Sequence, residues 1–106
     1  MPDRRKFLSR DPVNMTLEII GDRWSLRIVR NLMFEGRNSF GALLEAGGGI
    51  STSVLADRLR RLEVHRIIRH APVPGDNRRI KYQLTKRGID LGPILVEMML
   101  WSSAYK

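Results

Sequence analysis

The fold of this chain is decided by residues 39–84, SFGALLEAGGGISTSVLADRLRRLEVHRIIRHAPVPGDNRRIKYQL. Ser39 can cap an opening helical turn through its hydroxyl, and Phe40 and Leu43 follow at helical spacing. The three glycines 47–49 then end this helix, because glycine accepts the positive φ angles of a sharp turn. The stretch therefore opens with a short helix and a tight turn.

A second helix is expected directly after the turn, with Ser51 as its capping residue. Leu55, Leu59 and Leu62 recur at i, i+4 and i+7, so one face of this helix is apolar and packs inward. The opposite face carries short or guanidinium-bearing side chains, which a helix in a DNA major groove needs for close approach and for contact with base edges. The candidate reading residues are Ser51, Thr52, Ser53, Ala56, Asp57, Arg60 and Arg61.

Two strands are expected after the second helix. Residues 67–73 are rich in branched side chains, residues 74–77 (Pro-Gly-Asp-Asn) form a turn, and residues 79–84 alternate polar with apolar. This alternation puts Ile80 and Tyr82 on one face and the basic side chains on the other, where they can lie along a phosphate backbone. The candidate phosphate contacts are Asn77, Arg78, Arg79 and Lys81. The predicted fold is thus mainly α with a small β-hairpin, a winged helix-turn-helix.

The charge distribution agrees with this prediction. The chain of 106 residues fits one domain, and its net charge of +8 implies an acidic partner, either nucleic acid or an anionic membrane surface. Residues 51–88 hold ten basic side chains against three carboxylates. Residues 1–10 hold a further surplus and are expected to form a basic arm ahead of a domain over residues 11–106. Since the charge gathers on the second helix and the hairpin, double-stranded DNA is the expected partner and a membrane is not.

Helices are also expected on both sides of this motif. Pro12 opens a helix that ends at Gly21, and a strongly amphipathic helix runs from Trp24 to Gly36 and should form the centre of the core. Pro93 opens a last helix whose apolar residues cover most of its circumference, more than so small a core can bury. We expect a second copy of the chain to cover this surplus apolar surface in a homodimer. A two-fold dimer would place two reading helices about 34 Å apart, which is one turn of DNA. The expected contacts on this helix are Leu95, Met98, Met99 and Trp101. The alternative is that these residues complete the core of a monomer.

The order of several motifs resembles the HxlR-type bacterial transcriptional regulators. The matching residues are Asp11-Pro12, Leu17 to Gly21, Arg23-Trp24, Leu26, Phe40, Leu43, Gly49-Ile50-Ser51, Leu55, Leu59, Leu62, Tyr82 to Thr85, Gly88, Leu91 and Trp101, which cover residues 11–102. The resemblance implies a MarR-like winged-helix homodimer that binds an operator. It also implies that the N-terminal helix joins the dimer interface, which adds Val13 and Leu17 to the expected contacts.

The chain departs from the family pattern at two places. Members commonly carry a cysteine before the first proline, in some of them as a sensor of oxidants or electrophiles, whereas this chain has Asp11 there and no cysteine at all. Thiol chemistry is therefore unavailable. The family also usually has an acidic-Gly stretch after the reading helix, where this chain has Val64-His65-Arg66. Basic residues at that end suit the helix dipole.

Enzymatic chemistry finds no support in the sequence. His65 and His70 are five residues apart, which fits neither one helical face nor a metal site, and Gly47 to Ser51 lacks the spacing of a phosphate-binding loop. The predicted function is that of a cytoplasmic transcriptional regulator with no cofactor or metal, acting as a homodimer on an inverted-repeat operator. A winged-helix module that binds protein or RNA is the alternative, because the fold alone does not decide between them. An unidentified small-molecule effector is left open, with an apolar cleft near Trp24 and Trp101 as its expected place.

Overall fold

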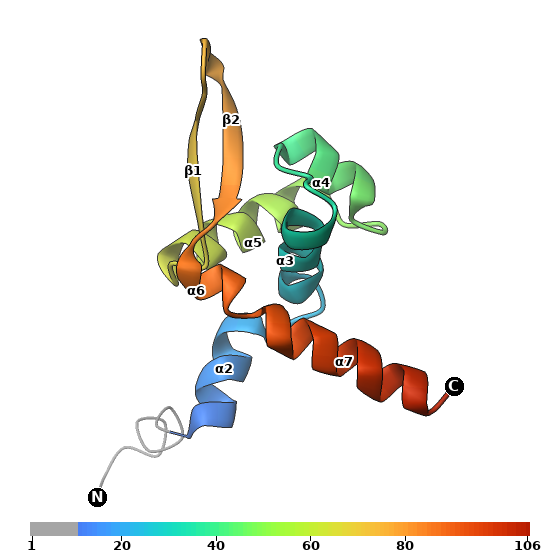
Figure 1. Cartoon of the computed structure of the whole chain (residues 1–106). Helices are drawn as coiled ribbons and strands as arrows, with labels where there is room; N and C mark the ends of the chain where they lie inside the picture. The colour runs from blue at the N-terminus through green and yellow to red at the C-terminus, as the bar shows by residue number, and fades with distance from the viewer. Residues whose placement is uncertain (1–10) are drawn as a thin grey trace, which may run out of the picture.

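The computed structural model describes residues 11–106, so the predicted basic arm of residues 1–10 lies outside the described residues. In chain order the helices and strands are α2 (Pro12–Ile20), α3 (Ser25–Phe34), α4 (Phe40–Ala46), α5 (Thr52–Val64), β1 (Ile68–Val73), β2 (Asp76–Leu84), α6 (Lys86–Ile89) and α7 (Gly92–Ala104). The two strands pair as an antiparallel hairpin. This order confirms the winged helix-turn-helix, with α5 as the reader helix and the β1–β2 hairpin as the wing (Figure 1).

Short side chains fix where the helices begin. Asp11 accepts a hydrogen bond from the backbone N–H of Val13 at 2.8 Å. The hydroxyl oxygens of Ser39, Ser51 and Thr85 accept from backbone N–H groups three residues further on, at 3.1, 3.2 and 3.1 Å. Each bond satisfies an amide that the first helical turn leaves free. The predicted caps at Ser39 and Ser51 are confirmed, and Thr85 caps α6 in the same way.

The hydrophobic core forms around the reader helix. Leu55, Leu59 and Leu62 are buried and pack with Val29 of α3 and Leu43 of α4. The same cluster also contains Ile28, Ile50, Ile67, Ile68 and Leu95. The amphipathic α3 thus lies at the centre of the core, as the sequence predicts. A backbone hydrogen bond attaches the hairpin to the segment just before α4, since the N–H of Tyr82 donates to the carbonyl of Asn38 at 2.8 Å.

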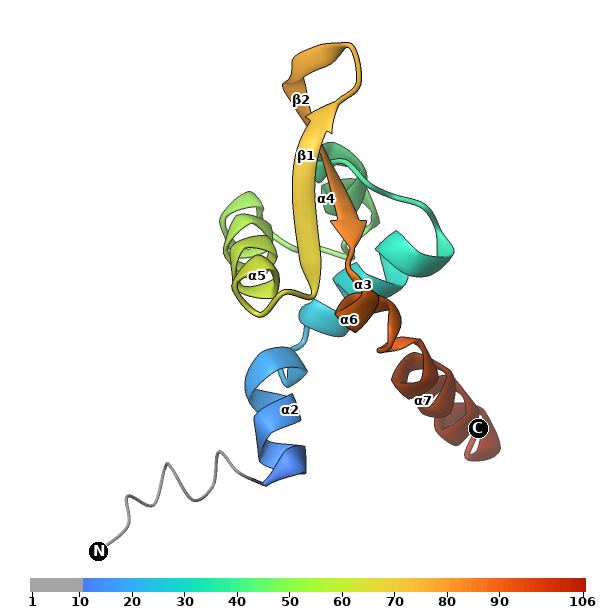
Figure 2. The ribbon, with the colours of Figure 1, turned by 60° about the vertical axis from the view of Figure 1, so that its left-hand side comes forward.

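Three elements project from this core. The wing extends at one end of the molecule, whereas α2 and α7 leave the core at the other end (Figures 1 and 2). The helices α2 and α7 leave several large apolar side chains exposed, among them Val13, Leu17 and Trp101.

The reader helix ends in a Schellman motif whose left-handed residue is an arginine. The N–H of Arg66 donates to the carbonyl of Glu63, and the N–H of Ile67 donates to the carbonyl of Leu62, both at 2.9 Å. Arg66 has a φ of 60°, a conformation that usually calls for glycine. The departure from the family pattern at Val64-His65-Arg66 therefore leaves the helix end in place, at a cost in backbone strain.

Replacing Arg66 should reveal that strain. Arg66→Gly relieves a left-handed penalty of about 1–2 kcal/mol, partly offset by about 0.5–1 kcal/mol of extra entropy in the unfolded chain. Arg66→Ala removes the same side chain but keeps the strain. We expect the glycine variant to unfold with a free energy about 1 kcal/mol higher than the alanine variant in urea titrations. Equal stability of the two variants would contradict this assignment.

Candidate nucleic-acid interface

The predicted reading residues lie on the outer face of α5. Ser51, Thr52, Ser53, Ala56 and Arg60 are exposed, and Asp57 and Arg61 are half-buried. The first three surround the start of the helix, where small hydroxyl side chains leave the backbone accessible. The buried leucine stripe turns this face outward, so its position follows from the packing of the core.

Asp57 is the one carboxylate on this face, and two arginines neutralise it. Its Oδ1 lies 2.8 Å from Arg60 Nη2, and its Oδ2 pairs with Arg58 Nη1. The hydrogen bond from Arg60 and the charges of both arginines hold the pKa of Asp57 below its usual value, against a smaller effect of desolvation. The side chain of Arg60 remains 75% exposed and is accessible to a ligand. The pairing thus prevents Asp57 from repelling a polyanion.

A second acidic residue ties the reader helix to the core. Asp22 accepts hydrogen bonds from the N–H groups of Trp24 and Ser25, at 2.8 and 2.9 Å, and from the Ser25 hydroxyl. Arg58 reaches across from α5 and donates through Nε to Asp22 at 3.1 Å. Arg58 therefore links Asp22 to Asp57 and fixes α5 against the start of α3. The sequence analysis did not find this pair, because partners 36 residues apart leave no local signal.

The environment of Asp22 favours its charged form. Burial raises the pKa of Asp22, but the hydrogen bonds from Ser25, the Trp24 backbone and Arg58 together lower it below the ordinary value of 3.8. A carboxylate with a lowered pKa stabilises the fold fully above the pKa that it has in the unfolded chain. That stabilisation is lost as the pH falls below about 3.8 through the folded-state pKa.

Asp22→Asn should therefore change both the free energy of unfolding and its dependence on pH. Loss of the charged acceptor should lower the free energy of unfolding at pH 7 by about 1–3 kcal/mol. Between pH 5 and about 2.5, the variant should lose less stability than the original chain, because position 22 no longer binds a proton there. Denaturant titrations across this range measure both effects. A double-mutant cycle with Arg58→Gln isolates the ion pair, and strictly additive effects would show that the pair contributes nothing.

The tip of the wing carries two freely accessible arginines. The side chain of Arg78 is 97% exposed, and Asn77 and Arg79 beside it are also exposed. The N–H of Arg78 donates to Asp76 Oδ1 at 3.1 Å, which holds the turn closed. Lys81 lies further down β2, beside Leu32 and Met33 of α3, on a cleft turned away from the reader helix. The tip arginines, rather than Lys81, therefore extend the basic surface of α5.

A small cleft separates the reader helix from the wing. It has a volume of about 180 Å³ and is lined by Ala56, Arg60 and Glu63 of α5 together with His70, Ile80 and Tyr82 of the wing, over Phe40 and Leu59. The predicted alternation in β2 agrees with this arrangement, since Ile80 and Tyr82 face the reader helix. His70 Nδ1 pairs with Glu63 Oε1 and so connects the wing to α5. Side chains of the reader helix and of the wing therefore meet along this cleft.

The predicted interface residues occupy a separate surface on α2 and α7. Val13, Leu17, Met98, Met99 and Trp101 are exposed, with Trp101 at 70%. Leu95 is the exception at 5%, because it packs into the core of its own chain and anchors the start of α7. Leu95 therefore has almost no surface left for a partner, and we correct that assignment.

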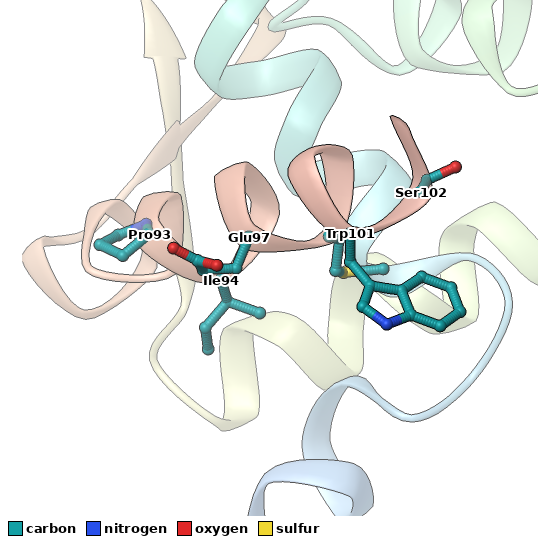
Figure 3. A pocket seen from close by; sticks show the side chains of 6 residues that line it. Pro93, Ile94, Glu97, Trp101 and Ser102 are labelled. Atoms are coloured by element: carbon teal, nitrogen blue, oxygen red, sulfur yellow. The ribbon is translucent and has the colours of Figure 1, made fainter. Parts of the chain in front are cut away.

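The exposed side of α7 forms a wide apolar groove, the outer groove. Its lining residues are Pro93, Ile94, Glu97, Met98, Trp101 and Ser102, and its volume is about 590 Å³. Ile94 and Trp101 project from the same side of the helix (Figure 3). Trp24 does not line this groove, and its ring lies 5.0 and 5.1 Å from the guanidinium carbons of Arg23 and Arg27. An apolar groove is therefore present beside Trp101, as expected, but without Trp24 in its lining.

Residues 11–106 show neither a membrane-spanning helix nor a metal-binding cluster. None of the helices in this range combines the length and the apolar character needed to cross a bilayer. Within the same range, no three histidine, cysteine or acidic side chains come together closely enough to hold a metal ion. The described part of the chain therefore exposes a polar, basic face on α5 and the wing and an apolar face on α2 and α7.

Comparisons with known proteins match this arrangement. The sequence profile described as HxlR-like helix-turn-helix matches residues 19–106. The HTH-type transcriptional regulator sll1512 of Synechocystis is 38% identical over 87 residues, which cover 82% of this chain and 64% of that protein. The crystal structure of PA1607, a candidate transcription factor, aligns with a TM-score of 0.82 and 37% identity over 89% of this chain and 64% of that one. The chain thus spans slightly less than two thirds of either relative.

The transcriptional regulator YodB of Bacillus subtilis is also similar, over nearly its full length. Its reduced form aligns with a TM-score of 0.77 and 28% identity, covering 90% of this chain and 92% of that one. A quinone-bound form of YodB aligns with a TM-score of 0.74 and 29% identity, over 88% of this chain and 97% of that one. The whole arrangement of helices and wing is therefore shared with a solved regulator.

Proposed function

This chain belongs to the HxlR-like helix-turn-helix family of transcriptional regulators, and from this membership we propose that it binds an inverted-repeat DNA operator as a homodimer. The observation that carries the proposal is that α5 and the wing meet along one cleft and that each carries exposed arginines. There, Arg60 and the tip arginines Arg78 and Arg79 are exposed, and Asp57 is neutralised. Such a surface fits the major groove together with the flanking phosphates.

In this proposal each part of the surface has a different task. The start of α5, with its small side chains Ser51, Thr52 and Ser53, enters the major groove closely, and Arg60 reaches base edges. The wing tip contacts phosphates outside the half-site, which sets the register but reads no sequence. The alternative is a winged-helix module for protein or RNA. It is disfavoured because a protein-binding reader face would be expected to be apolar or acidic.

Dimerisation is assigned to the apolar surfaces of α2 and α7. The exposed side chains Val13, Leu17, Met98, Met99 and Trp101 form more apolar surface than a small monomer normally leaves in water. A two-fold axis through this surface would pair the same patch on both copies and present two reader helices to one face of DNA.

Selection of duplexes from a random pool by the purified chain, at two salt concentrations, tests operator binding. An enriched inverted repeat with half-site centres about 10 base pairs apart supports the proposal. Retention without enrichment, lost as salt rises, leaves only nonspecific electrostatic binding and favours the alternative module.

Arginine variants should separate base reading from phosphate contact. Arg60→Ala should weaken binding to the selected site by about 1–3 kcal/mol per half-site and relax its specificity. Arg79→Ala should weaken binding to all DNA sequences to a similar extent. It should also reduce the slope of log affinity against log salt concentration by about one per half-site. Lys86→Ala is the matched control, since Lys86 is an exposed cation on α6 that pairs with Asp90. Fluorescence anisotropy at several salt concentrations measures all three, and docking through α5 is excluded if Arg60→Ala behaves like the control.

The dimer surface can be tested independently of DNA. Trp101→Glu places a charge in the middle of the proposed interface and should shift the chain to monomers in sedimentation equilibrium, because an unpaired buried carboxylate is costly. Ile89→Glu provides the control, since Ile89 is an exposed apolar residue on α6, outside that surface. If the mass measured for Trp101→Glu equals that of the unchanged dimer, the interface does not include Trp101.

A further inference from the structure

An ion-pair network of four side chains, Asp22, Arg58, Asp57 and Arg60, runs from the core to the outer face of the reader helix. Arg58 donates through Nε to Asp22 and through Nη1 to Asp57 Oδ2. The other oxygen of that carboxylate, Asp57 Oδ1, accepts from Arg60 Nη2 at 2.8 Å. The exposed fraction of the side chain rises along the network from 19% at Asp22 to 36% at Asp57 and 75% at Arg60. Arg60 is therefore the member that reaches solvent, and the other three hold it from the core side.

The choice of partner decides the direction in which Arg60 points. Two carboxylates lie within reach on the same helix, Asp57 three positions before Arg60 and Glu63 three positions after it. Glu63 is engaged by His70 of the wing, and Arg60 pairs with Asp57. A helical side chain already leans toward the start of its helix, and this pairing draws the guanidinium of Arg60 the same way. That end of α5 carries the small side chains that allow close approach to base pairs.

The network gives Arg60 a fixed direction but little net charge. Its two carboxylates and two guanidinium groups sum to zero. Attraction to phosphates depends on net positive charge, so the network adds little to sequence-independent binding. Recognition of a base edge depends instead on the direction of N–H groups, and the N–H groups of Arg60 that do not bind Asp57 remain free to donate. Arg60 is thus better suited to reading a base than to holding a phosphate.

We propose that Arg60 reads a guanine in each half-site and that Asp57 is the positioning residue that orients it, an inference that rests on the proposed function. The planar guanidinium presents parallel N–H groups, which match the O6 and N7 acceptors of guanine in the major groove. Arg58 is itself held by Asp22 and binds the other oxygen of the Asp57 carboxylate, which keeps Oδ1 directed at Arg60. The orientation exists before DNA binds, so Arg60 loses less conformational entropy on binding.

Fluorescence anisotropy with the selected duplex, its single-base-pair variants and an unrelated duplex tests both roles. Arg60→Ala should lower the preference for one G·C pair in each half-site by about tenfold or more. Asp57→Ala should lower the preference at the same base pair by about threefold or more. It should also raise the affinity for the unrelated duplex by about twofold or more, because Arg60 then carries an unpaired charge. In the Arg60→Ala background, Asp57→Ala should not change the preference further.

The opposite signs of these two changes separate orientation of Arg60 from support of the fold. Asp90→Asn is the matched control, because it removes one exposed carboxylate from the end of α6, away from the reader helix, and should leave the base preference unchanged. If Asp57→Ala lowers the affinity for all duplexes together, or lowers the preference at a different base pair, Asp57 does not orient Arg60 and the proposal is wrong. The proposal is also wrong if the base pair that depends on Arg60 is not G·C.

Nuclear magnetic relaxation of the arginine Nε–H groups measures the orientation without DNA. Arg60 should have a higher order parameter than Arg79 at the wing tip, which forms no ion pair with another residue of the range 11–106. Asp57→Ala should lower the order parameter of Arg60 to that of Arg79. Equal values in the unchanged chain overturn the proposal even if an operator is selected. If Arg60 is restrained but no operator is selected, the proposed function is wrong and the guanine assignment falls with it.

Discussion

Burial of the leucine stripe of α5 against α3 and α4 is the constraint on which the rest of the structure depends. Leu55, Leu59 and Leu62 cannot leave the core without exposing the largest part of it, so the rotation of α5 about its axis is fixed. The opposite face, with Arg60, is then necessarily the one that meets solvent. The wing is placed by the same core, because the buried residues Ile67 and Ile68 follow directly after the helix. Reader helix and wing are thus two consequences of one packing arrangement.

Features set by local chemistry could be predicted from the sequence, and those set by tertiary contacts could not. Helix caps such as Ser39 and Ser51, and the period of the leucines, act within a few residues and were correctly identified. Operator binding and the reading residues remain predictions from the same patterns. The Arg58–Asp22 pair joins residues 36 positions apart, and no periodicity points to it.

The surroundings of Leu95 and Lys81 depend on tertiary contacts, which the sequence pattern does not reveal. Leu95 belongs to an apolar helix, but only the structure shows that it is the residue that anchors α7 in its own core. Alternation in β2 correctly put Ile80 and Tyr82 on one face, where both line the cleft beside the reader helix, yet it could not show that Lys81 lies beside α3. Arg66 is a different case, because the sequence lacks the usual glycine after the reader helix and yet the helix ends there in a left-handed residue. Backbone hydrogen bonds of the Schellman motif outweighed the local strain.

The two sides of α7 differ in how well an apolar partner could cover them. The outer groove offers Ile94, Met98 and Trp101 with a single charged residue, Glu97, and a second copy can cover it without burying unpaired cations. The opposite side, between α3 and α7, is lined by Arg27, Arg30 and Lys106, which an apolar partner surface would desolvate without compensation. The cost of covering α7 with an apolar surface is therefore lower on the side of the outer groove, which supports placing the proposed dimer contact there.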